Sequence, residues 1–239
     1  MASSIFKSSR ANKTGLSLAL DATLKSSHDM TVFGLGAISE FTLCKYKHFA
    51  LQRYHFYTAM EQRFDVSKPG ESIYKVWQPL AKELRQSPCL KQDLKVVGIH
   101  DPQTLAPSPC TAAYVTCIEQ ASSDGLIGHF YCRYFADLFG GSMLGKPTAL
   151  ALHIPSPSFY SFSDTVTENR AAFIENIYEV INDCGETMDD EGREAVVNET
   201  ILAFNHNAHI VKEQGMGILP AAVGGLFNVS KGYIFSGNA

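Results

Sequence analysis

Hydrophobic residues recur with the spacing of an amphipathic helix over three long stretches of the chain that no proline interrupts. In the first stretch, which ends at Phe64, we predict one helix that begins after the capping residue Thr14 and another that follows Gly34 and Gly36. The second of these helices is apolar over a broad face, so we expect it to be largely buried. The apolar positions are Leu16, Leu18, Leu20 and Leu24 on one helix, and Phe41, Leu43, Phe49, Tyr54, Phe56 and Met60 on the other.

The other two proline-free stretches cover residues 111–146 and 158–219. The former is dense in aromatic residues and ends in a glycine cluster, and the latter contains two apolar runs with helical spacing. We expect the acidic segment 183–192 to be a turn and the proline-rich segments 100–110 and 147–158 to be loops. The apolar positions are Tyr114, Ile118 and the segment 126–144, then Phe173, Ile174, Ile177, Val180 and Ile181, and then Val196, Val197, Ile201, Phe204, Ala208 and Val211.

This pattern predicts an all-α fold, because the strict alternation of apolar and polar residues that is typical of strands is rare. The segments between the helices are too short and too apolar to separate domains, and no internal repeat is present. We therefore predict a single-domain, multi-helical bundle over residues 14–239. Residues 1–13 are rich in Ser, Lys and Arg and contain no acidic residue, which is typical of a disordered terminus or of a residual organelle targeting segment.

Charge and cysteine content narrow the classes of function. A net charge of −4 gives no electrostatic reason to expect nucleic acid as a partner. No apolar run reaches the roughly 18–20 residues that a membrane span needs, so we expect a soluble protein. The six cysteines form no CxxC pair, which favours free thiols in a reducing compartment over a disulfide framework.

The most unusual local feature is the segment 129–146, where Gly140 and Gly141 interrupt a run of helical periodicity. Glycine costs roughly 1 kcal/mol relative to alanine inside a helix. Close approach of the backbone to a flat ligand, combined with a kink, is a physical reason to accept that cost. The alternative is a plain helix end at Gly140.

This segment resembles the distal-helix signature of haem oxygenases, and especially their plastid branch, in the order of His129-Phe130-Tyr131, Tyr134-Phe135-Ala136 and Gly140-Gly141. Three further segments agree with the family in order and approximate spacing, and the resemblance covers residues 16–213. They are Leu16-Ser17-Leu18-Ala19-Leu20 through Ser26-Ser27-His28, Tyr54-His55-Phe56-Tyr57-Thr58-Ala59-Met60-Glu61, and Ala203-Phe204-Asn205-His206-Asn207.

The resemblance implies a role for each matching residue. His28 would bind the haem iron through a neutral imidazole nitrogen and leave the opposite face open for dioxygen. Asp137 would organise a water network that supplies protons at the iron, with Tyr57, Arg133 and Asn207 as its hydrogen-bonding companions. The resemblance also implies contacts with the haem for Gly140, Gly141, Phe204, Tyr131 and Lys25.

The same resemblance implies that haem is both cofactor and substrate, and that the products are biliverdin, carbon monoxide and ferrous iron. The chain carries no flavin or nicotinamide fingerprint, so electrons would come from ferredoxin or another reductase. The resemblance to the plastid branch of the family implies that the protein is located in the plastid stroma. The cytoplasm is the alternative location.

The chain departs from the family at the positions expected to neutralise the haem propionates. Asp21, Glu175 and Glu179 stand where the family has basic residues, and acidic groups would repel propionates. Lys25, Arg170 and Tyr131 are the candidates to compensate. The family's first distal glycine is Ala136 here. Because of these departures, the alternative remains that the chain is a non-catalytic relative of the family, which binds a tetrapyrrole or acts as an assembly or regulatory partner.

A second alternative rests on His206, His209 and Glu213, whose spacings of three and four place them on one helical face, as a non-haem metal site requires. Such sites need further carboxylates from facing helices, and we could assign none. A solvated helix face explains this run better.

Overall fold

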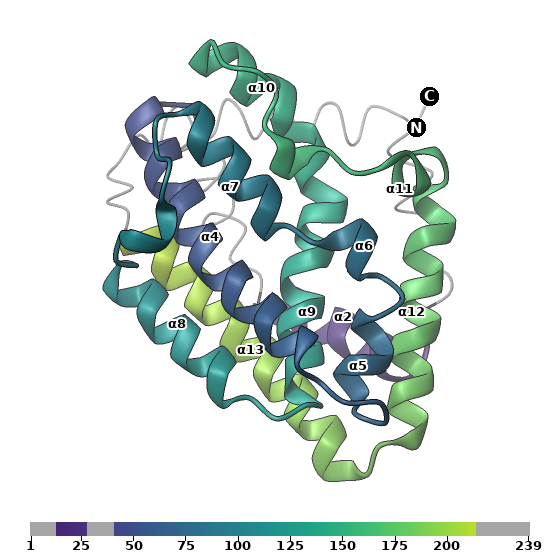
Figure 1. The fold of residues 1–239 in the computed structure, drawn as a ribbon. Helices are drawn as coiled ribbons and strands as arrows, with labels where there is room; N and C mark the ends of the chain where they lie inside the picture. Colours follow the sequence, from purple (N-terminus) through teal and green to yellow (C-terminus); the bar gives the residue numbers. More distant parts are fainter. Residues whose placement is uncertain (1–12, 28–40, 214–239) are drawn as a thin grey trace.

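The computed structural model describes residues 13–27 and 41–213, and the regular secondary structure in these ranges is entirely helical (Figure 1), which confirms the predicted all-α class. None of the described helices combines the length and the apolar character needed to cross a bilayer. In chain order the α-helices are α2 (Gly15–Ser27), α4 (Leu43–Asp65), α5 (Ser72–Trp77), α6 (Ala81–Leu84), α7 (Ser87–Val96), α8 (Pro109–Gln120), α9 (Gly125–Ala136), α10 (Ser142–Leu152), α11 (Asp164–Glu168), α12 (Arg170–Thr187) and α13 (Asp190–Glu213).

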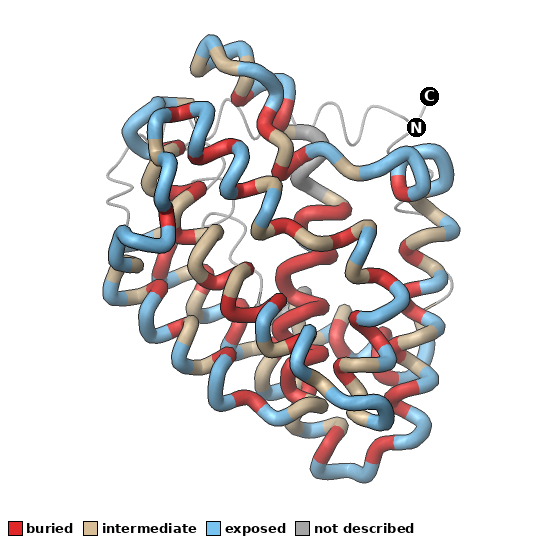
Figure 2. The backbone as a smooth tube through the Cα atoms, in the orientation of Figure 1, coloured by how far each residue is buried: buried red, intermediate tan, exposed pale blue. Residues whose placement is uncertain are grey.

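Helix α9 is the central element of the bundle. It runs through the middle of the molecule, and every residue from Gly125 to Phe135 is buried (Figure 2). Helix α13 lies along it, while α4, α5 and α2 also contact it. Beside α9, the indole of Trp77 packs against the rings of Phe64 and Tyr134, with centroids 5.2 and 5.6 Å away. Since α9 is buried along nearly its whole length, core packing fixes its position.

Glycine allows α9 and α13 to approach unusually closely. A Cβ atom on Gly128 would lie 2.5 Å from the carbonyl oxygen of Val196 and 2.7 Å from the backbone nitrogen of Thr200. Both contacts are with backbone atoms, which cannot rotate away as a flexible side chain can. The two helices therefore pack backbone against backbone at this point, and side chains of α13 reach groups on α9 that a wider spacing would leave apart.

We expect Gly128→Ala to lower the free energy of unfolding by about 1–3 kcal/mol, because the added methyl group must push α9 and α13 apart. Chemical denaturation followed by circular dichroism measures this change. Asn198→Ala is the control, since Asn198 is exposed on α13 and a surface substitution changes stability by no more than about 0.5 kcal/mol. An alanine variant as stable as the parent chain would mean that the close approach is not required.

Helix α2 begins directly after Thr14, as predicted. Its first turn is also capped by a residue that is distant in the sequence, Asn182 on α12. The backbone N–H of Ser17 donates to Oδ1 of Asn182, 2.9 Å away on α12, and the Asn182 amide donates to the Thr14 hydroxyl at 3.2 Å. A side chain from a distant helix thus satisfies a donor in the first turn of α2.

Three of the predicted boundaries are wrong. Helix α4 begins at Leu43, so Phe41 lies before it; α12 continues to Thr187, so the acidic segment is a turn only after that residue. Helix α10 runs through Pro147 to Leu152 and ends where His153 takes a positive φ of 53°. A proline removes only one backbone hydrogen bond, and the contacts of α10 with its neighbours support the rest of the helix.

The proline-punctuated segment between α4 and α8 forms helices that the pattern did not predict. Helices α5, α6 and α7 lie here, and Pro88 occupies the first turn of α7. A proline is well tolerated at that position because its missing N–H would have no partner within the helix.

Candidate functional site

Four of the residues that the resemblance singles out meet at the junction of α4, α9 and α13. The hydroxyl of Tyr57 donates to Oδ2 of Asp137, and Nη1 of Arg133 donates to Oδ1 of Asn207 at 2.9 Å. Arg133 also pairs with Asp137, with Nη2 and Oδ1 3.9 Å apart. We call Tyr57, Arg133, Asp137 and Asn207 the distal cluster. The structure thus brings together residues that are up to 150 positions apart in the chain.

Burial sets the electrostatics of the distal cluster. All four side chains are buried, with Asp137 only 4% exposed. Burial raises the pKa of Asp137, while Arg133, Arg53 and the Tyr57 hydroxyl each act to lower it. Burial also holds the pKa of Tyr57 well above its usual value, so its hydroxyl stays protonated and donates. The result is a carboxyl group held between a neutral phenol and a guanidinium in a low-dielectric interior.

Arg133 has hydrogen-bonding capacity that the described part of the chain does not use. Its Nε and Nη2 atoms are buried and have no hydrogen-bond partner among the described residues. Buried donors of this kind are rare in folded proteins and indicate that a ligand or ordered water completes the site.

The helix that carries Arg133 and Asp137 has one exposed position beside the distal cluster. From Gly125 to Leu138 every residue is buried except Ala136, which is exposed. Ala136 directly precedes Asp137 and lies about one helical turn before the glycine pair Gly140 and Gly141. Ala136 therefore gives this otherwise buried helix an exposed position three residues after Arg133, whose Nε and Nη2 atoms have no hydrogen-bond partner among the described residues.

The glycine pair lies inside a continuing helix, so the alternative of a helix end at Gly140 is wrong. Residues Asp137–Gly141 form a π-helical turn, η2, and α10 follows at once. π-Helical turns within α-helices are rare and are frequent at functional sites. The wider turn agrees with the kink that the two glycines predicted.

The remaining predicted haem contacts are placed only in part. His28 lies outside the described residues, directly after the end of α2 at Ser27, and the side chain of Lys25 on α2 is also outside the described part. Phe204 is buried on α13. Tyr131 is buried on α9 and hydrogen-bonded to Tyr178, and burial raises its pKa. The iron-binding role of His28 stays a prediction.

The acidic positions differ in their surroundings. The carboxylate of Asp21 forms an ion pair with the ammonium group of Lys13, so that this negative charge is neutralised from within the chain. Glu175 is half-buried and Glu179 is exposed on α12. Arg170, one of the predicted compensating residues, donates from Nη1 to the carbonyl oxygen of Leu138 at 3.3 Å, within the π-helical turn. Of the three acidic positions, Asp21 is therefore paired with a cation of the same chain.

The residues of the alternative metal run on α13 serve other contacts. His206 stacks on the ring of Tyr114 with centroids 5.2 Å apart. The Glu213 carboxylate accepts from the backbone N–H of Cys110 at 3.1 Å, and His209 is exposed. The structure does not bring these three side chains together as metal ligands.

Two charged residues near the site were missed from the sequence. Arg53 lies one helical turn before Tyr57 on α4 and acts on the carboxyl group of Asp137. Its guanidinium lies over the ring of Phe49, 3.4 Å from the centroid. Glu61, a further turn along α4, is buried and accepts a hydrogen bond from Tyr134 at 3.2 Å. A signal was present, since a charged residue at four-residue spacing within an apolar helix needs a buried partner.

Comparison with known families identifies residues 19–213 with the family model described as "Heme oxygenase". Among curated proteins, the "Heme oxygenase" of Rhodella violacea is 28% identical over 193 residues, which are 78% of this chain and 79% of that protein. "Heme oxygenase 1" of Synechocystis sp. is 30% identical over 166 residues, which are 67% of this chain and 66% of that protein.

Solved structures have the same fold. Heme oxygenase-1 from Synechocystis sp. in complex with heme superposes with a TM-score of 0.73 and 25% identity, covering 91% of this chain and 97% of that one. Heme oxygenase 2 from Chlamydomonas reinhardtii, solved without heme, gives a TM-score of 0.71 at 20% identity, covering 87% and 100%, and supports the fold alone.

Proposed function

The chain belongs to the haem oxygenase family, and from this premise we propose that it cleaves haem oxidatively to biliverdin, carbon monoxide and ferrous iron, using dioxygen and electrons supplied from outside. The observation that carries the proposal is the distal cluster beside the exposed Ala136 surface. A haem-binding protein with no reaction to perform has no need of a buried carboxyl group, phenol and guanidinium gathered at one point.

Haem, when bound, supplies the iron that activates dioxygen and the carbon atom that is oxidised. The chain's own residues hold and move protons. The Tyr57 hydroxyl contacts one oxygen of the Asp137 carboxyl group and Arg133 contacts the other, and together they fix the orientation of this group. The Nε and Nη2 atoms of Arg133, which have no hydrogen-bond partner among the described residues, hold water or an anionic ligand atom in place beside that carboxyl group. Proton transfer by such a positioned group contributes about 10²–10⁴-fold to a rate.

We infer that His28 is the iron ligand on the opposite face. Support comes from its place directly after α2, which contacts the distal helix α9, and from the suitability of a neutral imidazole for this role. We expect His28→Ala to weaken hemin binding at least about 10-fold, equivalent to about 1.4 kcal/mol, and to change the Soret band. A hemin titration followed by absorbance measures both.

His100→Ala is the matched control for this titration, because His100 is exposed in a loop between α7 and α8. It should bind hemin as the parent chain does. If His28→Ala leaves the affinity and the Soret band unchanged, another residue binds the iron.

Turnover is tested on the hemin complex by adding reductant and air and following the absorbance of biliverdin. Biliverdin formation supports the enzyme. A hemin complex that consumes reductant without forming biliverdin would instead identify the non-catalytic relative, which binds the tetrapyrrole for assembly or regulation.

For the electron donor we propose ferredoxin, and for the location the plastid stroma. The Ser-, Lys- and Arg-rich segment 1–13 and the similarity to proteins of Rhodella violacea and Guillardia theta support the location. Biliverdin formation driven by reduced ferredoxin tests the donor, and imaging of the fluorescently tagged full chain in an algal cell tests the location. Cytoplasmic fluorescence would favour the alternative location.

A further inference from the structure

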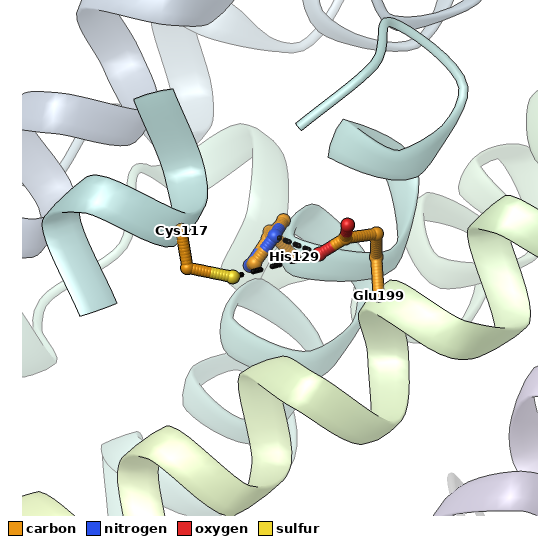
Figure 3. Close-up of side chains that lie close together, drawn as sticks. All are labelled: Cys117, His129 and Glu199. Carbon is orange, nitrogen blue, oxygen red and sulfur yellow. Dashed lines mark hydrogen bonds and ion pairs between the residues drawn. The ribbon is translucent and has the colours of Figure 1, made fainter. Parts of the chain in front are cut away.

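A thiol, an imidazole and a carboxylate from three helices meet at a second place in the molecule, away from the distal cluster. Cys117 comes from α8, His129 from α9 and Glu199 from α13, and one potential ligand atom of each lies within 4.8 Å of the others (Figure 3). Nε2 of His129 is 2.9 Å from Oε2 of Glu199, and Sγ of Cys117 is 3.7 Å from the same oxygen. We call these three residues the thiol–imidazole–carboxylate cluster.

The close approach of α9 and α13 creates this cluster. Gly125, one helical turn before His129, lies so near α13 that an added Cβ would be 2.7 Å from Cγ of Glu199. Together with the contact at Gly128, this brings the Glu199 carboxylate to the imidazole. His129 lies eight residues before Asp137, a rise of roughly 12 Å along the helix, and the two clusters share no residue. Tyr114 lies between them, because its hydroxyl contacts His129 and also hydrogen-bonds to Asn207 of the distal cluster.

The imidazole of His129 is oriented by a second hydrogen-bonding partner. Its Nδ1 lies 3.3 Å from the hydroxyl oxygen of Tyr114, and its side chain is fully buried. When Nδ1–H donates to Tyr114, the lone pair of Nε2 points to Glu199 and Cys117. Metal-ligating histidines are held in this way, with the second ring nitrogen bonded to a neighbouring oxygen.

We propose that Cys117, His129 and Glu199 bind a divalent zinc-type cation, a function beyond the cleavage of haem. Thiolate and imidazole ligands favour zinc over magnesium or calcium, and a carboxylate oxygen completes a common ligand set. Three protein ligands leave the fourth tetrahedral position for water, which reaches the site because the Glu199 side chain is 21% exposed.

The two separations that involve Glu199 suit such an ion after a small adjustment, and the Cys117 and His129 ligand atoms lie within 4.8 Å of one another. Tetrahedral zinc with bonds of about 2.0–2.3 Å keeps its ligand atoms roughly 3.3–3.8 Å apart. The Cys117–Glu199 separation of 3.7 Å already lies in this range, and the His129–Glu199 separation of 2.9 Å must open by a few tenths of an ångström. The partly exposed Glu199 side chain can make this movement. Binding releases the thiol proton of Cys117 to the solvent. The single proton of the neutral imidazole resides on Nδ1, where it donates to Tyr114, and Nε2 is free to bind the metal.

The competing explanation is a hydrogen-bonded pair of His129 and Glu199 that joins α9 to α13, with the Cys117 thiol as a weak additional donor. This explanation requires no metal at the cluster. It therefore predicts that replacing Cys117 leaves the amount of metal bound by the chain unchanged. Metal binding by the variants therefore separates the two explanations.

The test is equilibrium dialysis of the full chain against buffered Zn²⁺, with and without bound hemin, followed by metal analysis. We expect one Zn²⁺ per chain in both forms. Cys117→Ser should weaken binding at least about 100-fold, because even outer-shell substitutions cost about 10- to 100-fold. Glu199→Gln should also weaken it. In the hemin-free chain, Co²⁺ in place of Zn²⁺ should give a thiolate charge-transfer band that Cys117→Ser abolishes.

Cys110→Ser is the matched control, since Cys110 is on the same helix α8 and its thiol also neighbours a carboxylate, that of Glu213. It should bind Zn²⁺ as the parent chain does. Cys117→Ser replaces a single atom, and circular dichroism verifies that the variant is folded. Absence of Zn²⁺ from the dialysed chain, or equal loss of binding in the Cys110 and Cys117 variants, would overturn the proposal and leave the hydrogen-bonded pair.

Discussion

Replacing Asp137 with alanine is expected to slow biliverdin formation by about 10²–10⁴-fold while hemin still binds. The carboxyl group is the only acidic member of the distal cluster, and Tyr57 and Arg133 both point to it. Without it the buried guanidinium of Arg133 loses its ionic partner, and the proton supply beside the exposed Ala136 surface is lost. Hemin affinity should change little, because we place the iron ligand on the opposite side.

Single-turnover absorbance of the hemin complex, with reductant in excess, measures this effect separately from binding. Asp101→Ala is the control, since Asp101 is exposed in a loop. Burial raises the pKa of Asp137 from the ordinary aspartate value. The carboxylate form is the one that accepts from Tyr57 and pairs with Arg133 and so orders the proton-carrying water, and the parent rate should therefore fall as the pH decreases through that raised pKa. The residual rate of Asp137→Ala should lack this fall. A variant that retains the parent rate and pH profile would exclude Asp137 from the proton supply.

The parts of the site that could be predicted are those with a strong local signal. The glycine pair Gly140 and Gly141 inside an apolar periodic run predicted a distorted helix near a ligand, and a π-helical turn is found there. Tyr57, Arg133, Asp137 and Asn207 were predicted through resemblance, because nothing in their spacing shows that they meet. The structure places them together, and their catalytic role is what the Asp137 variant tests.

What could not be predicted depends on contacts between distant segments. Cys117 and His129 lie 82 and 70 residues before Glu199, and no spacing rule relates them. Their meeting follows from a glycine that removes a single Cβ at the crossing of α9 and α13. The Asn182 cap of α2 is of the same kind. Local patterns predict which faces are apolar, whereas packing decides which polar side chains face one another.

The acidic positions show the same limit for charge. From the sequence, Asp21 counts as one negative charge that would repel a propionate. In the structure Lys13 neutralises it. The sequence does not predict this ion pair, because Lys13 and Asp21 are not three or four residues apart, the spacing at which side chains meet on a helix. A charge that departs from the family pattern therefore has to be considered with its partner.

The largest effect on stability is expected for Glu61→Ala, at about 3–5 kcal/mol. The Glu61 carboxylate accepts the backbone N–H groups of Gln86 at 2.6 Å and Ser87 at 3.1 Å, which begin helix α7, as well as the hydroxyl of Tyr134. Its side chain is 2% exposed. Alanine leaves the buried N–H of Gln86 and the half-buried N–H of Ser87 without an acceptor, at roughly 1–3 kcal/mol for a buried group, and an unfilled space beside them. It also removes the negative charge at the N-terminal end of α7.

Chemical denaturation of Glu61→Ala, Glu61→Gln and Gln62→Ala resolves this effect into its parts. Gln62 is the exposed neighbour of Glu61 on α4, so its alanine variant should be within about 0.5 kcal/mol of the parent chain. Glu61→Gln retains the shape and one acceptor oxygen and should fall between the two. Because Glu61 joins α4 to the start of α7 and to Tyr134 on α9, its loss should also raise amide hydrogen exchange in α7 first. Equal stability of the Glu61 and Gln62 alanine variants would show that this buried carboxylate does not hold α7 in place.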